Sequence, residues 1–331
     1  MARSYDKHFK EEALKLSDEI GAKKAADQLG IPYNTVTTWR GKRKKYGDQA
    51  FVGSGHKQLP ASEQERRILE LEKEVKELQR ANDILHMTQE QYKLKMKDLI
   101  DNWQQRNGTV KTVQHKQEVE LLIDHTQNFI CDGVVCPEKW FSQSIRPLYL
   151  LKEAYGGGQW DLIADHLCKS GQISQMWRRV SKWTSGLLGT TENTLMPYGN
   201  WGDVDHYGNE YLQKIAVVNV KKSGGKSSSN MDEIRAYAQF DREELLRELE
   251  LCDPTVIVCG YTASVLDIIF KTSVRKARNE NLFYHIQLNG HDVLVLDYWH
   301  PANQYPDVMN YYGLMSIYQQ ALLAEKRRVG L

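Results

Sequence analysis

Three features that would narrow the function at once are missing from this sequence: paired cysteines, a long apolar run and a strong net charge. The five cysteines, at positions 131, 136, 168, 252 and 259, are odd in number and show no paired spacing. They argue against a disulfide framework and favour a reducing compartment with free thiols. Cys131 and Cys136 are followed by no second pair, so we expect no metal site and no cofactor.

No apolar run reaches the length of a membrane span, and the N-terminus lacks the apolar core of a signal peptide. We therefore expect a cytoplasmic protein with no membrane partner. The formal net charge is only +1, but the charge is unevenly spread. Residues 1–60 carry 12 Lys and Arg against 7 Asp and Glu, whereas the residues after 107 carry 23 against 26. The basic N-terminal part is where we expect first contact with a polyanion.

The length of 331 residues and the apolar fraction of 41% predict a multidomain protein with a substantial core. We divide it into a helix-turn-helix domain (1–58), a coiled-coil connector (59–107) and an α/β domain (108–331). The connector expectation rests on Leu71, Leu78 and Leu85, which fall seven residues apart.

Helical periodicity in the N-terminal domain predicts helices at 6–17, 22–29 and 35–45, with Gly30 ending the second and Asn34 capping the third. Two helices joined by a short turn that contains glycine form the helix-turn-helix pattern. Val36 and Trp39 should pack inward. The polar side chains of the third helix and the basic run after it should contact base edges and phosphates. These expected DNA-binding residues are Thr35, Thr37, Thr38, Arg40, Lys42, Arg43, Lys44 and Lys45. A small helical bundle with a solvated basic end is the alternative.

The runs YDKHFKEEALKL and GAKKAADQLGIPYNTVTTWRGKRKKYG resemble the small OrfA-type subunit of insertion-sequence transposases, over about residues 4–86. The resemblance implies binding to DNA as a multimer and a link to DNA transposition. It does not imply strand transfer, because the carboxylate-triad nuclease of that family belongs to the other subunit.

The connector has an a/d heptad seam over residues 68–85, with Ile68, Val75 and Asn82 three positions before the leucines. Leucine at d with Ile or Val at a favours a two-stranded coiled coil, and a buried asparagine sets its register. We expect a homodimer or higher homo-oligomer through this segment. A single amphipathic helix packed on its own domain is the alternative. Asn107-Gly108 reads as a turn.

The C-terminal domain alternates four apolar strand candidates, 145–151, 215–220, 255–259 and 293–298, with helical stretches at 160–168, 174–188, 231–251, 263–270 and 308–326. This alternation predicts a three-layer α/β domain with a four-stranded parallel sheet. Ligands of such sheets bind beyond the carboxyl ends of the strands. Glu153, Asn219 and His300 follow or end three of these strands, and we interpret Asn219 as a base-recognising residue.

The stretches LYLLKEAYGGGQWD, AVVNVKKSGG and DYWHPAN are similar to motifs of the uracil-DNA glycosylase superfamily, over residues 144–320. The resemblance implies a DNA repair hydrolase in which Glu153 orients water, Asn219 binds the base and His300 stabilises the departing anion. Tyr155 or Trp160 would stack on the base, and Ser223 and Lys226 would hold phosphates. Lys222 stands where iron–sulfur members have cysteine, so no cluster is expected.

Each of these side chains also has a plainer explanation. Glu153 could pair at a strand end, Asn219 could tie down its own loop, and His300 could be structural. GGKSS lacks the first glycine of a phosphate loop, which excludes a nucleotide triphosphatase. The alternative to an enzyme is a non-catalytic, transposase-derived DNA-binding or regulatory protein, and a further one is a fusion in which the N-terminal arm is a remnant.

Overall fold

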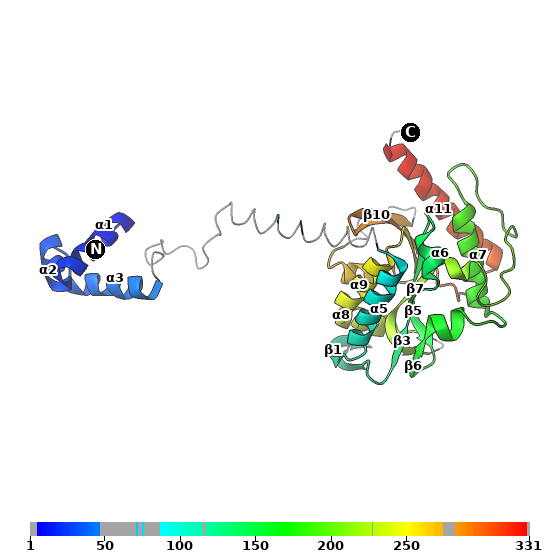
Figure 1. Cartoon of the computed structure of the whole chain (residues 1–331), viewed down its shortest axis with the longest axis horizontal. Coiled ribbons are helices and arrows are strands. Elements are labelled where there is room, and N and C mark those ends of the chain that lie inside the picture. The colour runs from blue at the N-terminus through cyan, green and yellow to red at the C-terminus, as the bar shows by residue number, and fades with distance from the viewer. Residues whose placement is uncertain are drawn as a thin grey trace. The chain divides into compact units, whose positions relative to one another are not determined.

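The computed structural model describes residues 5–46, 71, 75, 87–114, 117–226, 228–273 and 282–329. The chain divides into two compact units, residues 1–72 and residues 73–331, which we describe separately (Figure 1). None of the described helices is both long enough and apolar enough to cross a membrane.

Residues 5–46 of the N-terminal unit form three helices, α1 (Lys7–Ile20), α2 (Ala22–Leu29) and α3 (Tyr33–Tyr46). Helix α1 begins where the side chain of Asp6 accepts a hydrogen bond from the backbone N–H of Phe9 at 2.8 Å. Gly30 ends α2 in the left-handed conformation at φ 63°, as expected for this turn. The small core of the unit is formed by Ala13, Leu14, Ala26, Ile31, Val36 and Trp39.

Helix α3 begins two residues earlier than the sequence indicated. It starts at Tyr33, directly after Pro32, whose carbonyl accepts from the N–H of Thr35 at 2.9 Å. Asn34 therefore lies inside the first turn, so its expected role as the N-cap is wrong. The fixed φ of a proline suits the first turn of a helix, which explains the earlier start. Val36 and Trp39 are buried, as predicted.

The second unit is built on a mixed sheet of six strands in the order β4-β7-β5-β8-β10-β9. The four strands at its centre, which the sequence predicted, all run parallel. The edge strands β4 and β9 run antiparallel to their neighbours, so a sheet of four parallel strands alone was too simple. The strands are β4 (Gly133–Val134), β7 (Ala216–Gly225), β5 (Pro147–Tyr155), β8 (Val256–Gly260), β10 (His291–Tyr298) and β9 (Phe283–Leu288).

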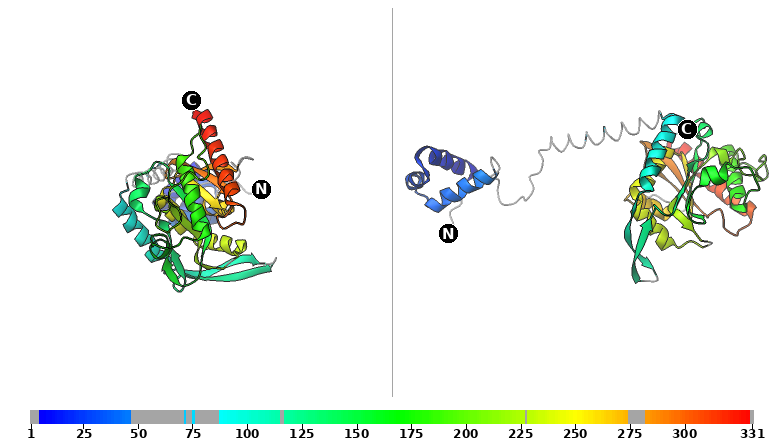
Figure 2. Two further views of the ribbon diagram at one scale, coloured as in Figure 1. Left: turned by 90° about the vertical axis from the view of Figure 1, so that its right-hand side faces the viewer. Right: turned by 60° about the horizontal axis from the view of Figure 1, so that its bottom comes forward.

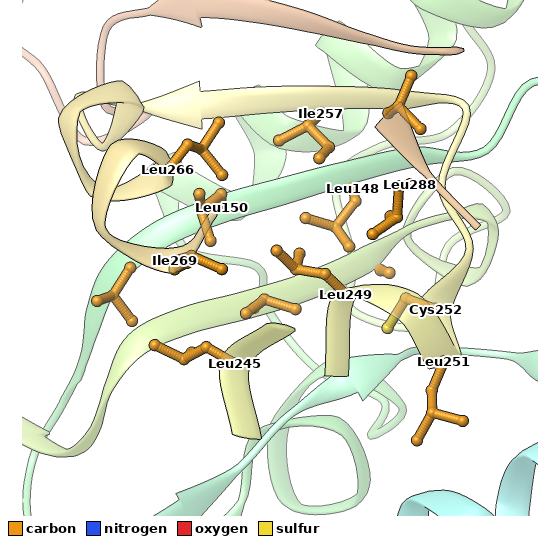
Figure 3. Packing of buried hydrophobic residues seen from close by; sticks show 14 of the residues in the cluster. Leu148, Leu150, Leu245, Leu249, Leu251, Cys252, Ile257, Leu266, Ile269 and Leu288 are labelled. Carbon is orange, nitrogen blue, oxygen red and sulfur yellow. The ribbon is translucent and has the colours of Figure 1, made fainter. Parts of the chain in front are cut away.

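Alternate side chains of the central strands enter two cores, one on each face of the sheet, giving three layers. On one face Leu148, Leu150 and Ile257 pack against helices α8, α9 and α10 (Figure 3). On the other face Tyr149 and Val258 pack against α7 and α11. The period of two that separates these faces is the signature of a strand covered on both sides. The bounds of the helices are α7 (Gln175–Gly189), α8 (Met231–Phe240), α9 (Arg242–Cys252), α10 (Ala263–Ile269) and α11 (Asp307–Val329).

Two expected helices take a different form. The stretch 160–168 begins in the short strand β6 (Gln159–Asp161), which pairs with β3 (Phe129–Cys131). It then forms a single π-helical turn at Ile163–Leu167. The stretch 231–251 is broken into α8 and α9 at Asp241. The buried carboxylate of Asp241 accepts from the indole N–H of Trp103 at 2.9 Å, a partner from a distant segment.

Helix α5 (Gln89–Trp103), which the sequence assigned to the connector, packs into the core of the α/β unit through Tyr92, Met96 and Trp103. It is followed by an antiparallel hairpin of β1 (Asn107–Gln114) and β2 (Gln117–Asp124), which projects from the unit (Figure 2). Asn107-Gly108 thus begins a strand and is not a turn. Short elements at Pro137–Phe141 (α6) and Leu212–Lys214 complete the unit. The heptads of 68–85 lie outside the described residues, except for Leu71 and Val75, which are helical and exposed.

Candidate functional site

A cavity of about 740 Å³ lies at the carboxyl ends of the parallel strands, where α/β sheets bind ligands. The structure brings together here the residues that the sequence singled out on three distant segments. Glu153 comes from the end of β5, Asn219 from β7 and His300 from the loop after β10. Tyr155 and Trp160 line the same cavity.

The carboxamide of Asn219 is held in one orientation by a residue that the sequence did not reveal. Oδ2 of Asp132 accepts from both the backbone N–H and the side-chain Nδ2 of Asn219, each at 2.9 Å. Because a carboxylate only accepts, Nδ2 must face Asp132, and Oδ1 must point the other way. Among the described residues, Oδ1 and the second Nδ2 hydrogen are left for a ligand, so this amide can both accept and donate.

Asp132 is in turn part of a buried charged cluster with Lys222 and Glu248. The ammonium of Lys222 pairs with Oδ1 of Asp132 and with Oε2 of Glu248, the latter at 2.6 Å. All three side chains are at most 1% exposed. Burial and the nearby charge of Asp132 raise the pKa of Glu248 well above its usual range. A neutral Glu248 leaves one compensated ion pair, Lys222 with Asp132, which is the arrangement that a buried site favours.

Glu153 is also paired. Its Oε2 lies 2.9 Å from the ammonium of Lys221, which also contacts Oε1 of Glu233 at 2.6 Å. The side chain of Glu153 is 6% exposed, and a Cβ on Gly225 would lie 2.3 Å from its carboxyl carbon. The carboxylate is thus fixed between a cation and the backbone of β7. This pairing matches the plainer explanation of Glu153 and leaves it one oxygen for a water molecule.

His300 presents a neutral ring to the cavity. The backbone N–H of Ala302 donates to its Nδ1 at 3.2 Å, so the proton of the neutral ring is carried by Nε2. Burial, assisted by the positive charge of Lys152, lowers the pKa of His300 to about 4. At neutral pH the ring therefore offers an N–H donor without carrying a charge.

The loop that carries His300 is braced by Arg179 of α7, which sequence reasoning did not find. The guanidinium is buried and donates to the carbonyls of Pro301 and Asn303 at 2.6 and 2.7 Å. It also donates from Nε and Nη2 to Oδ1 of Asp307, at 2.8 and 2.6 Å. One side chain thus ties the histidine loop to the start of α11.

Three further site residues were expected near the cavity. Tyr155 is 78% exposed at its mouth, and Lys226 lines it from the loop after β7. Ser223 does not reach the surface, because β7 continues to Gly225 and Ser223 lies within it. Its hydroxyl is buried and donates to the hydroxyl of Tyr237 at 2.8 Å. Ser223 as a phosphate contact is therefore a wrong prediction.

The glycine loop after β5 lies against the end of β7, backbone to backbone, which gives a prediction. A Cβ on Gly224 of β7 would lie 1.4 Å from the carbonyl oxygen of Gly156. Gly224→Ala should therefore force the loop away from the strand and lower the free energy of unfolding by about 1–3 kcal/mol in urea denaturation. Gly157→Ala is the matched control, because nothing lies within 4 Å of its Cβ position. Equal stability of the two variants would contradict this packing.

On the N-terminal unit, α3 displays the residues expected to contact DNA. Thr38, Arg40, Lys42, Lys44 and Lys45 are exposed, and Thr35, Thr37 and Arg43 are half-buried. Asp18 of α1 pairs with Arg40 at 3.3 Å and also with Arg43. Both guanidinium groups are thereby held on one side of the helix, where they are exposed enough to exchange this carboxylate for a phosphate.

The described part of the chain contains no group of three or more His, Cys, Asp or Glu residues able to hold a metal ion. All five cysteines are free thiols, and Cys252 and Cys259 are buried. Burial raises the pKa of Cys131 to about 12. A thiol with so high a pKa is protonated at neutral pH and is a poor nucleophile.

The comparison with protein families identifies the N-terminal region. Residues 1–83 match a family model described as transposase, of the helix-turn-helix type. This region, which holds α1 to α3, is therefore similar to the helix-turn-helix of transposases, and such a domain indicates DNA binding. No curated protein matches the chain.

Proposed function

We propose that this protein binds DNA through its N-terminal helix-turn-helix and excises uracil or another deaminated base with its α/β domain. The observation that carries the proposal is the meeting of Glu153, Asn219 and His300 in one cavity at the carboxyl edge of the sheet. The resemblance of residues 144–320 to uracil-DNA glycosylases supports the same assignment. A dimer formed through residues 68–85 would place two arms on one DNA.

The proposed reaction is hydrolysis of the N-glycosidic bond of a base that has left the stack. Oδ1 and Nδ2 of Asn219 would pair with N3–H and O4 of a pyrimidine. Nε2–H of His300 would donate to O2 as negative charge develops on the leaving base. Glu153 would stabilise the positive sugar as the bond between C1′ and the base breaks and its electron pair leaves with the base. Glu153 would also orient a water molecule, whose oxygen bonds to C1′ while its proton passes to the second carboxylate oxygen of Glu153.

Excision of uracil from single-stranded and double-stranded oligonucleotides tests this proposal. We expect Asn219→Ala and Glu153→Gln each to lower the single-turnover rate at least tenfold. Asn193→Ala is a suitable control, since this exposed asparagine lies in a loop that does not line the cavity. Absence of cleavage of any deaminated base by the parent chain would overturn the excision proposal.

A second candidate function follows from the Lys221 ion pair at Glu153. The carboxylate of Glu153 already faces the ammonium of Lys221 at 2.9 Å, which gives this side chain a structural role without any chemistry. The alternative is therefore a non-catalytic, transposase-derived DNA-binding or regulatory protein in which the cavity binds a base without cleaving it. Binding of uracil-containing DNA without excision, lost in Asn219→Ala, would support this alternative.

The helix-turn-helix makes an independent prediction about DNA affinity. The double variant Lys42→Ala/Lys44→Ala should bind duplex DNA of every sequence more weakly. The magnitude of the slope of log K against log salt concentration should fall by roughly two. Lys23→Ala on α2 should change neither. Fluorescence anisotropy at several salt concentrations measures both quantities. An unchanged slope would show that these lysines do not contact phosphates.

A further inference from the structure

A second cavity, of about 350 Å³, opens on the same edge of the sheet as the first. It lies between the starts of α8 and α10 and the end of β10, and its walls include Tyr261, Trp299 and Arg235. Among the described residues that line this cavity, Asp297 carries a carboxylate. The proposed excision chemistry uses none of these side chains.

Three large aromatic side chains stand exposed beside this cavity. Tyr261 is 55% exposed, Trp299 46% and Tyr305 53%. The rings of Trp299 and Tyr305 lie 5.5 Å apart between centroids. We call these three residues the aromatic ledge. Exposed aromatic rings in a group are unusual on a protein surface without a partner and mark an interaction site.

Tyr261 is held in a backbone conformation that costs free energy. Its φ is 63°, in the left-handed region that β-carbon-bearing residues avoid. Its N–H donates to the carbonyl of Tyr298 at 2.9 Å, which fixes this turn next to Trp299. Glycine would adopt the same φ without strain, so the backbone alone does not explain a tyrosine here. Strain of this kind gathers at functional positions.

The ledge is continuous with the cavity lined by Glu153, Asn219 and His300, which we call the base cavity. A Cβ on Gly260 would lie 3.3 Å from Cδ2 of His300, and the next residue is Tyr261. Lys152 lines the base cavity while its ammonium lies 4.8 Å from the centroid of the Tyr261 ring. A strand that placed one nucleotide in the base cavity would therefore pass directly over the ledge, with Lys152 and Arg235 beside its phosphates.

We propose that the aromatic ledge binds single-stranded DNA, stacking the bases next to the one that enters the base cavity. Bases stack on aromatic side chains regardless of sequence, and nearby cations hold the backbone. A duplex keeps its bases stacked on one another and cannot offer their faces to three rings. This inference rests on the proposed function, since it makes single-stranded DNA the preferred substrate.

The test measures binding of labelled hexathymidine, which contains no uracil, to the full chain by fluorescence anisotropy. Lys42→Ala/Lys44→Ala serves as the background, so that the helix-turn-helix contributes little. Trp299→Ala and Tyr261→Gly should each weaken binding roughly fivefold to hundredfold. Tyr261→Gly removes the ring where glycine suits the backbone, so this variant should remain folded. Trp299→Phe should retain most of the affinity, and Met309→Ala, exposed on α11, should retain all of it.

If both Trp299→Ala and Tyr261→Gly bind hexathymidine as tightly as the parent, the proposal that the ledge binds single-stranded DNA is wrong. This holds whether or not the parent excises uracil. An equal loss of affinity for a duplex of the same length would overturn its preference for single strands. Weakened hexathymidine binding by the two variants, together with no excision of a deaminated base by the parent chain, would support the ledge and reject the excision proposal. The two proposals are thus tested by different readouts.

Discussion

Replacing Lys222 with methionine should lower the free energy of unfolding of the α/β unit by about 3–5 kcal/mol. The substitution leaves the carboxylate of Asp132 buried without its cation, next to Glu248. Although burial opposes it, the charge of Asp132 and the hydrogen bonds to Asp132 and Glu248 raise the pKa of Lys222 above its usual value. A raised lysine pKa stabilises the fold below the unfolded-state value, so the contribution is fully present at pH 7 and is lost only as the pH rises through the folded-state pKa. Urea denaturation followed by tryptophan fluorescence measures the change.

Lys214→Met is the matched control. Lys214 also pairs with a glutamate, Glu210, but these side chains are 28% and 62% exposed. Its loss should cost less than about 1 kcal/mol. Adding Asp132→Asn to Lys222→Met should recover part of the lost stability, because the buried carboxylate left without its cation is then neutral. A loss for Lys222→Met as small as that for Lys214→Met would contradict the buried ion pair.

Arg179→Ala should cost a similar amount, about 3–5 kcal/mol, because it leaves the carbonyls of Pro301 and Asn303 without this donor and leaves Lys182 as the remaining cation beside Asp307. Arg179→Lys should recover little of this, since an ammonium cannot span acceptors arranged around a planar guanidinium. With the loop released, the ring of His300 should become solvated. Its pKa, followed by NMR, should then rise from about 4 toward the ordinary value of 6.5.

The neighbouring Arg178 provides the control for Arg179. It pairs with Asp205 at 2.6 Å, but the two side chains are 32% and 73% exposed. Arg178→Ala should change stability by less than about 1 kcal/mol and leave the pKa of His300 where it is. A His300 pKa that stays at about 4 in Arg179→Lys would show that the loop holds its shape without the guanidinium.

Elements whose signal is local could be predicted from the sequence. The three N-terminal helices carry their own periodicity and the Gly30 stop, and the central strands are apolar runs buried on both faces. The strand β4 has two residues and no such pattern, and it exists because β7 offers it an edge. The hairpin of β1 and β2 depends on pairing between the two strands, which periodicity in one strand does not reveal.

The residues of the candidate site also fall into two groups, those with a local signal in the sequence and those set by tertiary contacts. Glu153, Asn219 and His300 could be selected because each lies at or after the expected end of an apolar run, and parallel strands end at one edge. Strands β5 and β7 continue past Glu153 and Asn219, which the apolar runs did not indicate. Asp132 and Arg179 could not, because their partners lie 87 and more than 120 positions away in the chain. Ser223 was misplaced because small polar residues suggested a loop, whereas β7 continues through them. Supporting residues of a site are set by tertiary contacts, which composition and spacing do not encode.

Titration of the chain with free uracil, followed through the side-chain amide signals of asparagines in ¹⁵N-labelled protein, tests the central claim most directly. The amide held by Asp132 should be the one that binds the base. We expect the Asn219 Nδ2 signal to shift with saturation, and the shift to vanish in His300→Ala or weaken in Asp132→Asn. A saturable uracil shift that spares Asn219, or no shift at millimolar uracil, would contradict the account.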